Sequence, residues 1–215
     1  MHPKQYTKQK QERLQVTWIH TIAPEHADGP LADLYQRVRG PDGNVDNILK
    51  AHSLRPPTLT GHMSLYKAVL HHPHNQLEPW FREALGVLVS QLNHCEYCVV
   101  HHKAGMRRLI GDEPRADAAC AALAGGSWGD AFSSAERAAL AYAKSLTVDP
   151  ASIDTLDIDD LRTAGWDDGE ILEINQVTAY FSYANRTVLG LGVDTEGDQL
   201  GLAPAGEEEN DWRHG

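Results

Sequence analysis

The chain has 215 residues and a formal net charge of -11, and 41% of its residues are hydrophobic and 23% are charged. These values are typical of one globular domain, and they exclude a collagen-like repeat, a small disulfide scaffold and a wholly disordered chain. The excess of carboxylates disfavours nucleic acid and anionic membrane surfaces as partners, because both carry negative charge themselves.

Apolar residues recur at helical spacing along almost the whole chain, and the alternation typical of strands is missing. We expect helices over residues 30–39, 45–54, 57–71, 78–92 and 95–109, and two more that begin near residues 134 and 168. The last two follow Ser-x-x-Glu and Asp-x-x-Glu sequences, which have the spacing of capping boxes. Turns are expected at 40–47, 71–75 and 124–130, where Gly, Pro and Asn gather. The pattern predicts an all-α fold, a bundle of seven to nine helices.

The two ends of the chain differ from the middle in charge. Residues 1–20 have a net charge of +3, and we interpret them as an N-terminal extension. Residues 194–215 contain seven carboxylates against one arginine, which predicts an acidic, loosely ordered C-terminal tail. The helical domain is expected over residues 21–193. No apolar run reaches the ~18 residues of a membrane span, and the start has no apolar signal region, so we expect a cytoplasmic protein.

The informative stretch contains Cys95 and Cys98 in a Cys-x-x-Cys pair, with His102 four residues later. Helical steps of three and four place both sulfurs and the imidazole on the inward face of one helix. If Asn93 caps this helix, Glu96 falls at its third position and Cys95 lies in the first turn. The helix dipole lowers the pKa of a thiol there, which favours a nucleophilic thiolate.

The preceding helix contains Glu83, twelve residues before Cys95. Its neighbours one turn away on either side are apolar, so we expect the carboxyl to be partly buried. Burial would raise the pKa of Glu83 towards neutrality, which suits a group that both takes and gives a proton.

The arrangement Glu83-x11-Cys95-x2-Cys98-x3-His102 resembles the signature of the alkylhydroperoxidase D (AhpD)-like proteins of the carboxymuconolactone decarboxylase superfamily. Residues from about 30 to 193, including the closing YFSYANRTVLGLGV, are similar to the subgroup of peroxidase-related enzymes. The resemblance implies an all-helical fold and obligate homo-oligomers, trimers or hexamers. It also implies reduction of organic (alkyl) hydroperoxides by the dithiol, which an external dithiol of lipoyl or thioredoxin type regenerates without a metal or other cofactor.

Carried over by position, the resemblance makes Cys98 the peroxidatic cysteine, Cys95 the resolving one, and Glu83 with His102 a proton relay. The helix terminus by itself favours Cys95 as the nucleophile, whereas the imidazole one turn away favours Cys98. We assign the attack to Cys98, because a helix terminus contributes only about 0.3–1 kcal/mol at ordinary exposure. Where the family proteins have a histidine just before the second cysteine, this sequence has Tyr97. The substrate pocket and the reductant are therefore expected to differ.

Other interpretations of the Cys-x-x-Cys pair stay open. Two thiolates and a nearby imidazole supply three of the four ligands of a zinc site, but a second ligand pair is missing from the sequence. The same dithiol also suits a disulfide oxidoreductase with little peroxidase activity. A third alternative is a redox-sensing oligomeric binding protein. Decarboxylation of a carboxymuconolactone is disfavoured, because it would leave both cysteines without a role.

Several residues outside this constellation draw attention. Cys120 lies in an alanine-rich run and is expected to pack as a small apolar residue. The histidines of the 71–75 turn offer at most adventitious metal binding at the surface. Tyr180, Tyr183, Asn185 and Arg186 lie late in the last helix and need polar partners if buried. We leave open whether they lie at a subunit interface or line the pocket.

Overall fold

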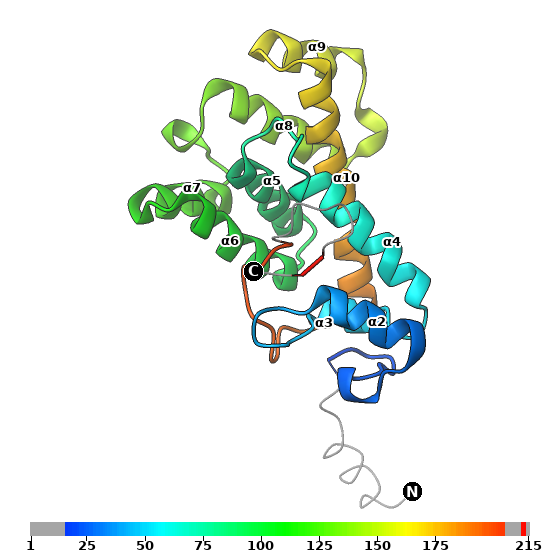
Figure 1. Cartoon of the computed structure of the whole chain (residues 1–215). Helices are drawn as coiled ribbons and strands as arrows, with labels where there is room; N and C mark the ends of the chain where they lie inside the picture. Colours follow the sequence, from blue (N-terminus) through cyan, green and yellow to red (C-terminus); the bar gives the residue numbers. More distant parts are fainter. Residues whose placement is uncertain (1–15, 205–211, 214–215) are drawn as a thin grey trace, which may run out of the picture.

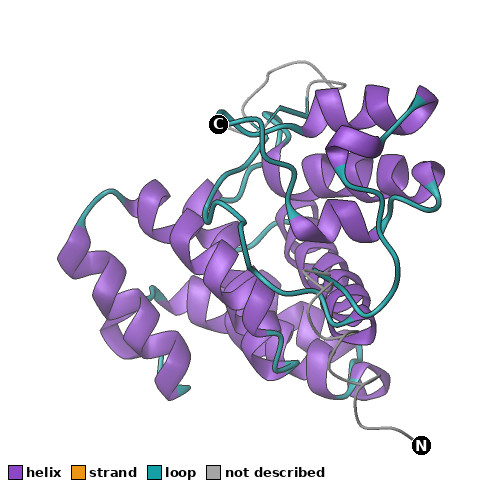
Figure 2. Cartoon of the chain, turned by 90° about the horizontal axis from the view of Figure 1, so that it is seen from below, coloured by secondary structure: helices purple, strands orange, loops and turns teal. Residues whose placement is uncertain are grey.

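The structure is a computed structural model that describes residues 16–204 and 212–213. These residues form nine α-helices and no β-strand, so the predicted all-α class is confirmed (Figures 1 and 2). The α-helices are α2 (Gly29–Val38), α3 (Asn47–Ala51), α4 (Pro56–Tyr66), α5 (Pro79–Leu92), α6 (Glu96–Ile110), α7 (Glu113–Gly125), α8 (Ser134–Val148), α9 (Thr155–Ala164) and α10 (Asp168–Leu191). Short 3-10 turns η1 (Pro24–His26), η3 (Gly129–Ala131) and η4 (Pro150–Ser152) and a π-helical turn η2 (Lys67–His71) complete the series.

Helix α5 is the centre of the core. All eleven residues from Trp80 to Ser90 are buried, and the helix packs against α6, α7, α8 and α10 (Figure 1). A helix that is surrounded in this way must be apolar on nearly every face. Its Phe81 ring stacks parallel to Trp166, which lies just before α10. Residues on α5 are therefore held by neighbours on all sides.

Local signals explain where most helices begin. Both predicted capping boxes are present, at Ser133 with Glu136 before α8 and at Asp167 with Glu170 before α10. The helix predicted over 57–71 runs as α4 and then widens into the π-turn η2. Asn75 donates from its side-chain amide to the carbonyls of residues 68 and 69 (3.2 and 2.9 Å), which occupies acceptors at the end of that turn.

The segments next to both termini pack against the helical domain. Trp18 donates its backbone N–H to the Leu191 carbonyl at 2.7 Å, and Asp194 donates to the Val16 carbonyl at 3.2 Å. The Asp198 side chain is fully buried and accepts hydrogen bonds from the Asn47 N–H of α3 at 3.0 Å and from the Tyr97 hydroxyl of α6. Residues 16–20 and 194–204, which belong to the predicted extension and tail, thus include residues that contact the helical domain. The rest of those two predictions concerns residues 1–15, 205–211 and 214–215, which lie outside the described part of the chain.

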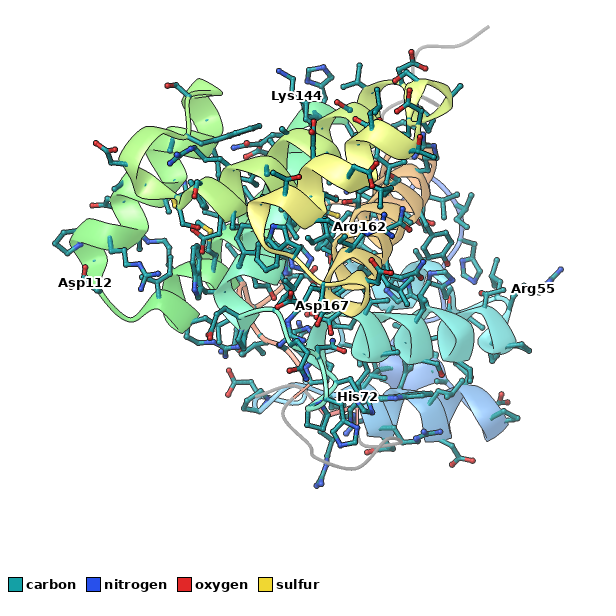
Figure 3. All side chains as sticks on the ribbon, turned by 90° about the horizontal axis from the view of Figure 1, so that it is seen from above. Arg55, His72, Asp112, Lys144, Arg162 and Asp167 are labelled. Carbon is teal, nitrogen blue, oxygen red and sulfur yellow. The ribbon has the colours of Figure 1, made fainter. Side chains whose placement is uncertain are left out.

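The surface has the expected polar character. Charged side chains such as Asp112, Lys144 and Arg162 lie at the periphery of the molecule (Figure 3). None of the helices that the structure describes combines the length and apolar character needed to cross a bilayer.

Candidate active site

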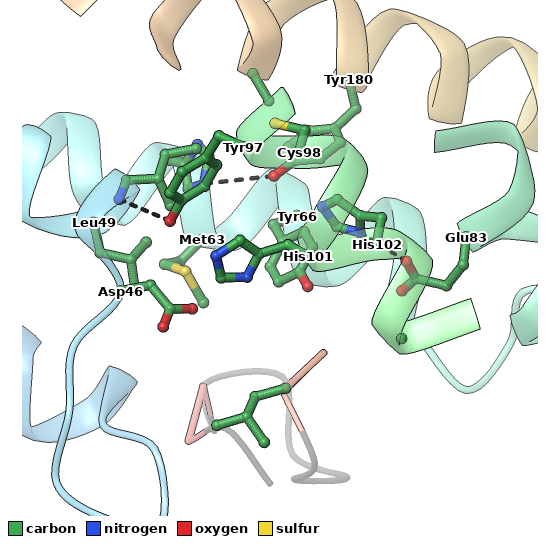
Figure 4. A pocket seen from close by; sticks show the side chains of 15 residues that line it. Asp46, Leu49, Met63, Tyr66, Glu83, Tyr97, Cys98, His101, His102 and Tyr180 are labelled. Carbon is green, nitrogen blue, oxygen red and sulfur yellow. Dashed lines mark hydrogen bonds and ion pairs between the residues drawn. The ribbon is translucent and has the colours of Figure 1, made fainter. Parts of the chain in front are cut away.

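Glu83 on α5 and His102 on α6 meet at the interface of the two helices. His102 Nδ1 lies 2.7 Å from Glu83 Oε2, and the two side chains are only 14% and 4% exposed. A carboxylate can only accept a hydrogen bond, so Nδ1 of the imidazole carries the proton and donates it. The other ring nitrogen, Nε2, is then the one that accepts a proton. Figure 4 shows the His102 ring between Cys98 and Glu83.

The pKa of Glu83 differs from the sequence prediction. Burial raises the pKa of this carboxyl, but the charge and hydrogen bond of His102, together with the positive charges of His71 and Arg108, lower it more. The net pKa is below the usual value, so the predicted shift towards neutrality is wrong. The prediction rests on burial alone, whereas His102, His71 and Arg108 decide the direction of the pKa shift. Glu83 is therefore ionised, and its contact with Nδ1 fixes the orientation of the His102 ring.

Aromatic packing fixes the His102 ring from the side. Phe181 of α10 approaches it edge-on, with ring centroids 4.5 Å apart and an interplanar angle of 89°. Gly86 of α5 makes this approach possible, because a Cβ atom at that position would lie 2.2 Å from the Phe181 ring. The glycine therefore serves close packing between α5 and α10.

The turn between α5 and α6 places the two cysteines. His94 has a φ of 57°, in the left-handed region, and Cys95 donates its N–H to the Ser90 carbonyl at 2.8 Å. A hydrogen bond from a backbone N–H to the carbonyl five residues earlier, with a left-handed residue just before the donor, is the Schellman motif that ends a helix. Asn93 thus belongs to the end of α5, and Cys95 itself is the N-cap of α6. The predicted cap at Asn93 is wrong, because the C-terminal pattern of α5 occupies that residue.

The two thiols share a proton. Cys98 donates its S–H to Cys95, which lowers the pKa of Cys95 and raises that of Cys98 well above its usual value; burial raises the Cys98 pKa further. The positive end of α6 also favours the negative charge on its N-cap. Of the two sulfurs, Cys95 is therefore the one on which a negative charge is favoured.

A polar group behind the sulfurs supports this charge. Asn185 on α10 forms hydrogen bonds with both cysteines and donates to the Ser90 hydroxyl at 3.0 Å. Its amide oxygen accepts from Asn93 at 3.0 Å, which fixes the orientation of the amide. Ser90 and Asn185 are fully buried. The sequence left open whether Tyr180, Tyr183, Asn185 and Arg186 lie at a subunit interface or line the pocket. Of these residues, Asn185 contacts the two cysteines and belongs to the site.

A cavity of about 40 Å³ lies in front of Cys98, between α3, α4, α6 and α10 (Figure 4). It is lined by Cys98 and His102 and, opposite them, by His62, Tyr66 and Tyr180, but Cys95 does not line it. The volume accommodates about three water-sized groups. Only one of the two sulfurs thus faces a space that a small reactant can occupy.

Tyr97 anchors a C-terminal segment over this cavity. Its hydroxyl donates to Asp198 at 2.6 Å and accepts from the Ile48 N–H at 3.2 Å. Burial and the Asp198 charge raise the pKa of Tyr97 well above its usual value. Leu202, four residues further on, lines the cavity. Tyr97, where the pattern that this sequence resembles has a histidine, therefore holds the segment that carries Leu202 in place.

Sequence reasoning missed His62, Tyr66, Ser90, Asp198 and Leu202. His62, Tyr66 and Ser90 are polar or ionisable residues in otherwise apolar helical patterns, and this interruption of the pattern could have identified them as site residues. Asp198 and Leu202 gave none, because the acidic composition of the tail indicated poor order. Among the described residues, no group of three or more His, Cys, Asp or Glu has an arrangement that could hold a metal ion.

The fold and the site together define a class of protein: an all-helical domain with a buried Cys-x-x-Cys pair, a histidine on the helix that follows that pair, and a carboxylate on the preceding helix that contacts this histidine. Residues 56–145 match the model of the carboxymuconolactone decarboxylase family. No curated protein sequence matches the chain.

Solved structures with the same fold cover nearly the whole domain. An uncharacterized peroxidase-related protein with an AhpD core from Ralstonia eutropha JMP134 is 22% identical, with a TM-score of 0.73 over 86% of this chain and 95% of its own. A peroxidase-related protein from Silicibacter sp. TM1040 is 25% identical, with a TM-score of 0.69 over 87% and 95%. The debrominase Bmp8 is 21% identical, with a TM-score of 0.64 over 86% and 94%. Residues 56–145 are thus similar to the carboxymuconolactone decarboxylase family, and the domain shares its fold with AhpD-like, peroxidase-related proteins.

Proposed function

We propose that the protein is a thiol-dependent peroxidase that reduces organic hydroperoxides through the Cys95/Cys98 dithiol. The observation that carries this proposal is the small cavity that Cys98 and His102 line together, while Cys95, whose pKa is lowered by its hydrogen bond with Cys98, does not line it. A hydroperoxyl group has two oxygen atoms, and a cavity of about 40 Å³ matches a group of that size. The names of two similar proteins, both peroxidase-related, agree with this class of reaction.

The first step is attack on the hydroperoxide. His102 takes the thiol proton of Cys98 at Nε2, and the Glu83 carboxylate stabilises the resulting imidazolium. The Cys98 thiolate attacks the terminal peroxide oxygen, so a sulfur–oxygen bond forms while the oxygen–oxygen bond breaks. The alkoxide leaving group receives the proton from His102 and departs as an alcohol. Cys98 is left as a sulfenic acid.

The second step forms and then reduces a disulfide. The Cys95 thiolate attacks the Cys98 sulfur and displaces hydroxide, which takes up a proton from solvent and becomes water. An external dithiol, of lipoyl or thioredoxin type, supplies two electrons. It restores the Cys98 thiol and the Cys95 thiolate, becomes a disulfide itself and returns one proton to solvent.

A disulfide oxidoreductase that acts on protein thiols is the alternative. Cys95 and Cys98 are 0% and 2% exposed, which hinders docking of a protein disulfide and favours a small reactant. The same burial favours a reductant of lipoyl type over one of thioredoxin type. The similarity to a debrominase indicates that this fold also supports other chemistry.

We further propose a homo-oligomer, a trimer or a hexamer. The long helix α10 exposes Leu172, Tyr183 and Leu189 to solvent in the single chain. Apolar side chains of this kind are commonly covered when subunits associate.

The function is tested by peroxide consumption with three cysteine variants. Cys98→Ser is expected to abolish turnover of cumene hydroperoxide with a dithiol reductant. Cys95→Ser is expected to consume one equivalent of peroxide and to accumulate a sulfenic acid on Cys98, detected by mass spectrometry. Cys120→Ser is the matched control, because this third buried thiol lies outside the site, and it should retain full turnover. Full activity of Cys98→Ser would refute the assignment.

A further inference from the structure

A second cavity lies beside the N-terminal end of α5, away from the two sulfurs. Its volume is about 470 Å³, in the range of small-molecule binding sites. The segment from η2 to α5 forms one wall, Arg108 and Leu109 of α6 a second, and Ala203 and Pro204 a third. Its ionisable lining residues are Arg82, Arg108, His71, His72 and Glu78. The cavity is therefore rich in basic groups, although the whole chain has a net charge of -11.

Arg82 is the unusual member of this lining. It is only 5% exposed, and its Nε and Nη1 atoms are fully buried without a hydrogen-bond partner in the described part of the chain. Buried guanidinium groups are normally paired, because leaving such donors unsatisfied is costly. Burial lowers the pKa of Arg82, and nearby carboxylates offset this only in part.

The nearby carboxylates already have other partners. Glu173 accepts hydrogen bonds from the backbone N–H groups of Gln76 and Leu77 (2.8 and 2.9 Å). Glu83 accepts from His102 on the other side of α5. Glu78 lies at the exposed rim and leaves the N-terminus of α5 without a side-chain cap. The positive end of this helix adds to the charge of the arginines.

We propose that this cavity is a binding site for an oxyanion, a carboxylate or phosphate group, held by Arg82 and Arg108. The planar guanidinium offers paired donors that match the oxygens of either group. One source of such a group is a small molecule from solution. Another is the chain itself, because Pro204 is followed by Glu207, Glu208 and Glu209. The proposal is independent of the peroxidase assignment.

Calorimetric titration of the full chain with inorganic phosphate, and separately with acetate, tests the site at constant ionic strength set with chloride. We expect saturable binding of at least one of the two anions at a single site. Arg82→Met, which keeps the apolar part of the side chain, should weaken this binding at least tenfold. Arg55→Met removes a charge at the periphery and should leave the binding unchanged (Figure 3).

A triple variant, with Glu207, Glu208 and Glu209 each replaced by Gln, separates the two sources. Tighter anion binding by this variant means that the chain's own carboxylates compete for the site, and unchanged binding assigns the site to a free anion. Absence of saturable binding both in the full chain and in the triple variant would overturn the proposal. So would wild-type affinity in Arg82→Met. If that variant does not fold, Arg108→Gln takes its place: a several-fold weaker affinity supports the proposal, and an unchanged affinity overturns it.

Discussion

Glu83→Gln isolates the contribution of the buried carboxylate to the reaction. The amide oxygen of Gln still accepts a hydrogen bond from His102 Nδ1, so the ring keeps its orientation, but the negative charge is lost. The wild-type contact is 2.7 Å long between side chains that are 14% and 4% exposed. A hydrogen bond to a charged group contributes about 1.5–3 kcal/mol and one between neutral groups about 0.5–1.5 kcal/mol, so loss of the charge costs about 1–1.5 kcal/mol. Because each 1.36 kcal/mol is a factor of ten in rate, formation of the Cys98 sulfenic acid should slow by about 5- to 13-fold.

The assay is stopped-flow mixing of the reduced protein with one equivalent of cumene hydroperoxide. Glu113→Gln is the matched control, because this glutamate changes its charge in the same way but is 90% exposed. A rate for Glu83→Gln within twofold of the wild type would refute the idea that the carboxylate stabilises the imidazolium.

The same variant gives a pH-dependent signature in stability. The folded pKa of Glu83 is below its usual value of 4.5, so its stabilising contribution is present above that pH. The contribution is lost as the pH falls through the folded pKa. The difference in free energy of unfolding between wild type and Glu83→Gln, measured with urea, should therefore shrink as the pH falls from about 5 to lower values. A difference that grows with acidity would contradict the lowered pKa.

Two further substitutions test the packing around the site. Gly86→Ala places a Cβ atom 2.2 Å from the Phe181 ring, so it should cost about 1–3 kcal/mol of stability and also reduce peroxide turnover, since this ring fixes the imidazole. Gly190→Ala, where nothing lies within 4 Å, should change neither property, and equal effects of the two variants would count against the packing argument. Tyr97→Phe removes the 2.6 Å hydrogen bond to Asp198 and should lower the urea unfolding free energy by about 1.5–3 kcal/mol. It should also speed amide hydrogen exchange in residues 194–204, and unchanged exchange there would show that the anchor is elsewhere.

Much of the helical pattern could be predicted from the sequence because its signals are local. The capping boxes before α8 and α10 each lie within four residues, and a periodic apolar stripe identifies a helix without knowledge of its neighbours. The juxtaposition of Glu83 with His102 was also predictable, but through the family spacing. The α5–α6 turn was harder, because the end of one helix and the start of the next compete for Asn93. The Schellman bond of Cys95 to Ser90 decides that competition.

Contacts between distant parts of the chain were beyond sequence reasoning. Asp198 lies 101 residues from its partner Tyr97, and its acidic surroundings in the sequence indicated a solvated tail. The prediction of a raised pKa for Glu83 was wrong for the same reason. Its direction depends on His102, His71 and Arg108, none of which is a neighbour in its own helix.

Most of the wall of the small cavity comes from segments other than α5. Leu49 on α3, Met63 on α4, Ala184 on α10 and Leu202 near the C-terminus all line it, and α5 contributes Glu83. Substitutions at these four positions alter the shape of the space while the residues of α5 stay unchanged. Such a layout is a favourable scaffold for directed evolution. Libraries restricted to the four wall positions explore new reactants while the thiol chemistry stays intact.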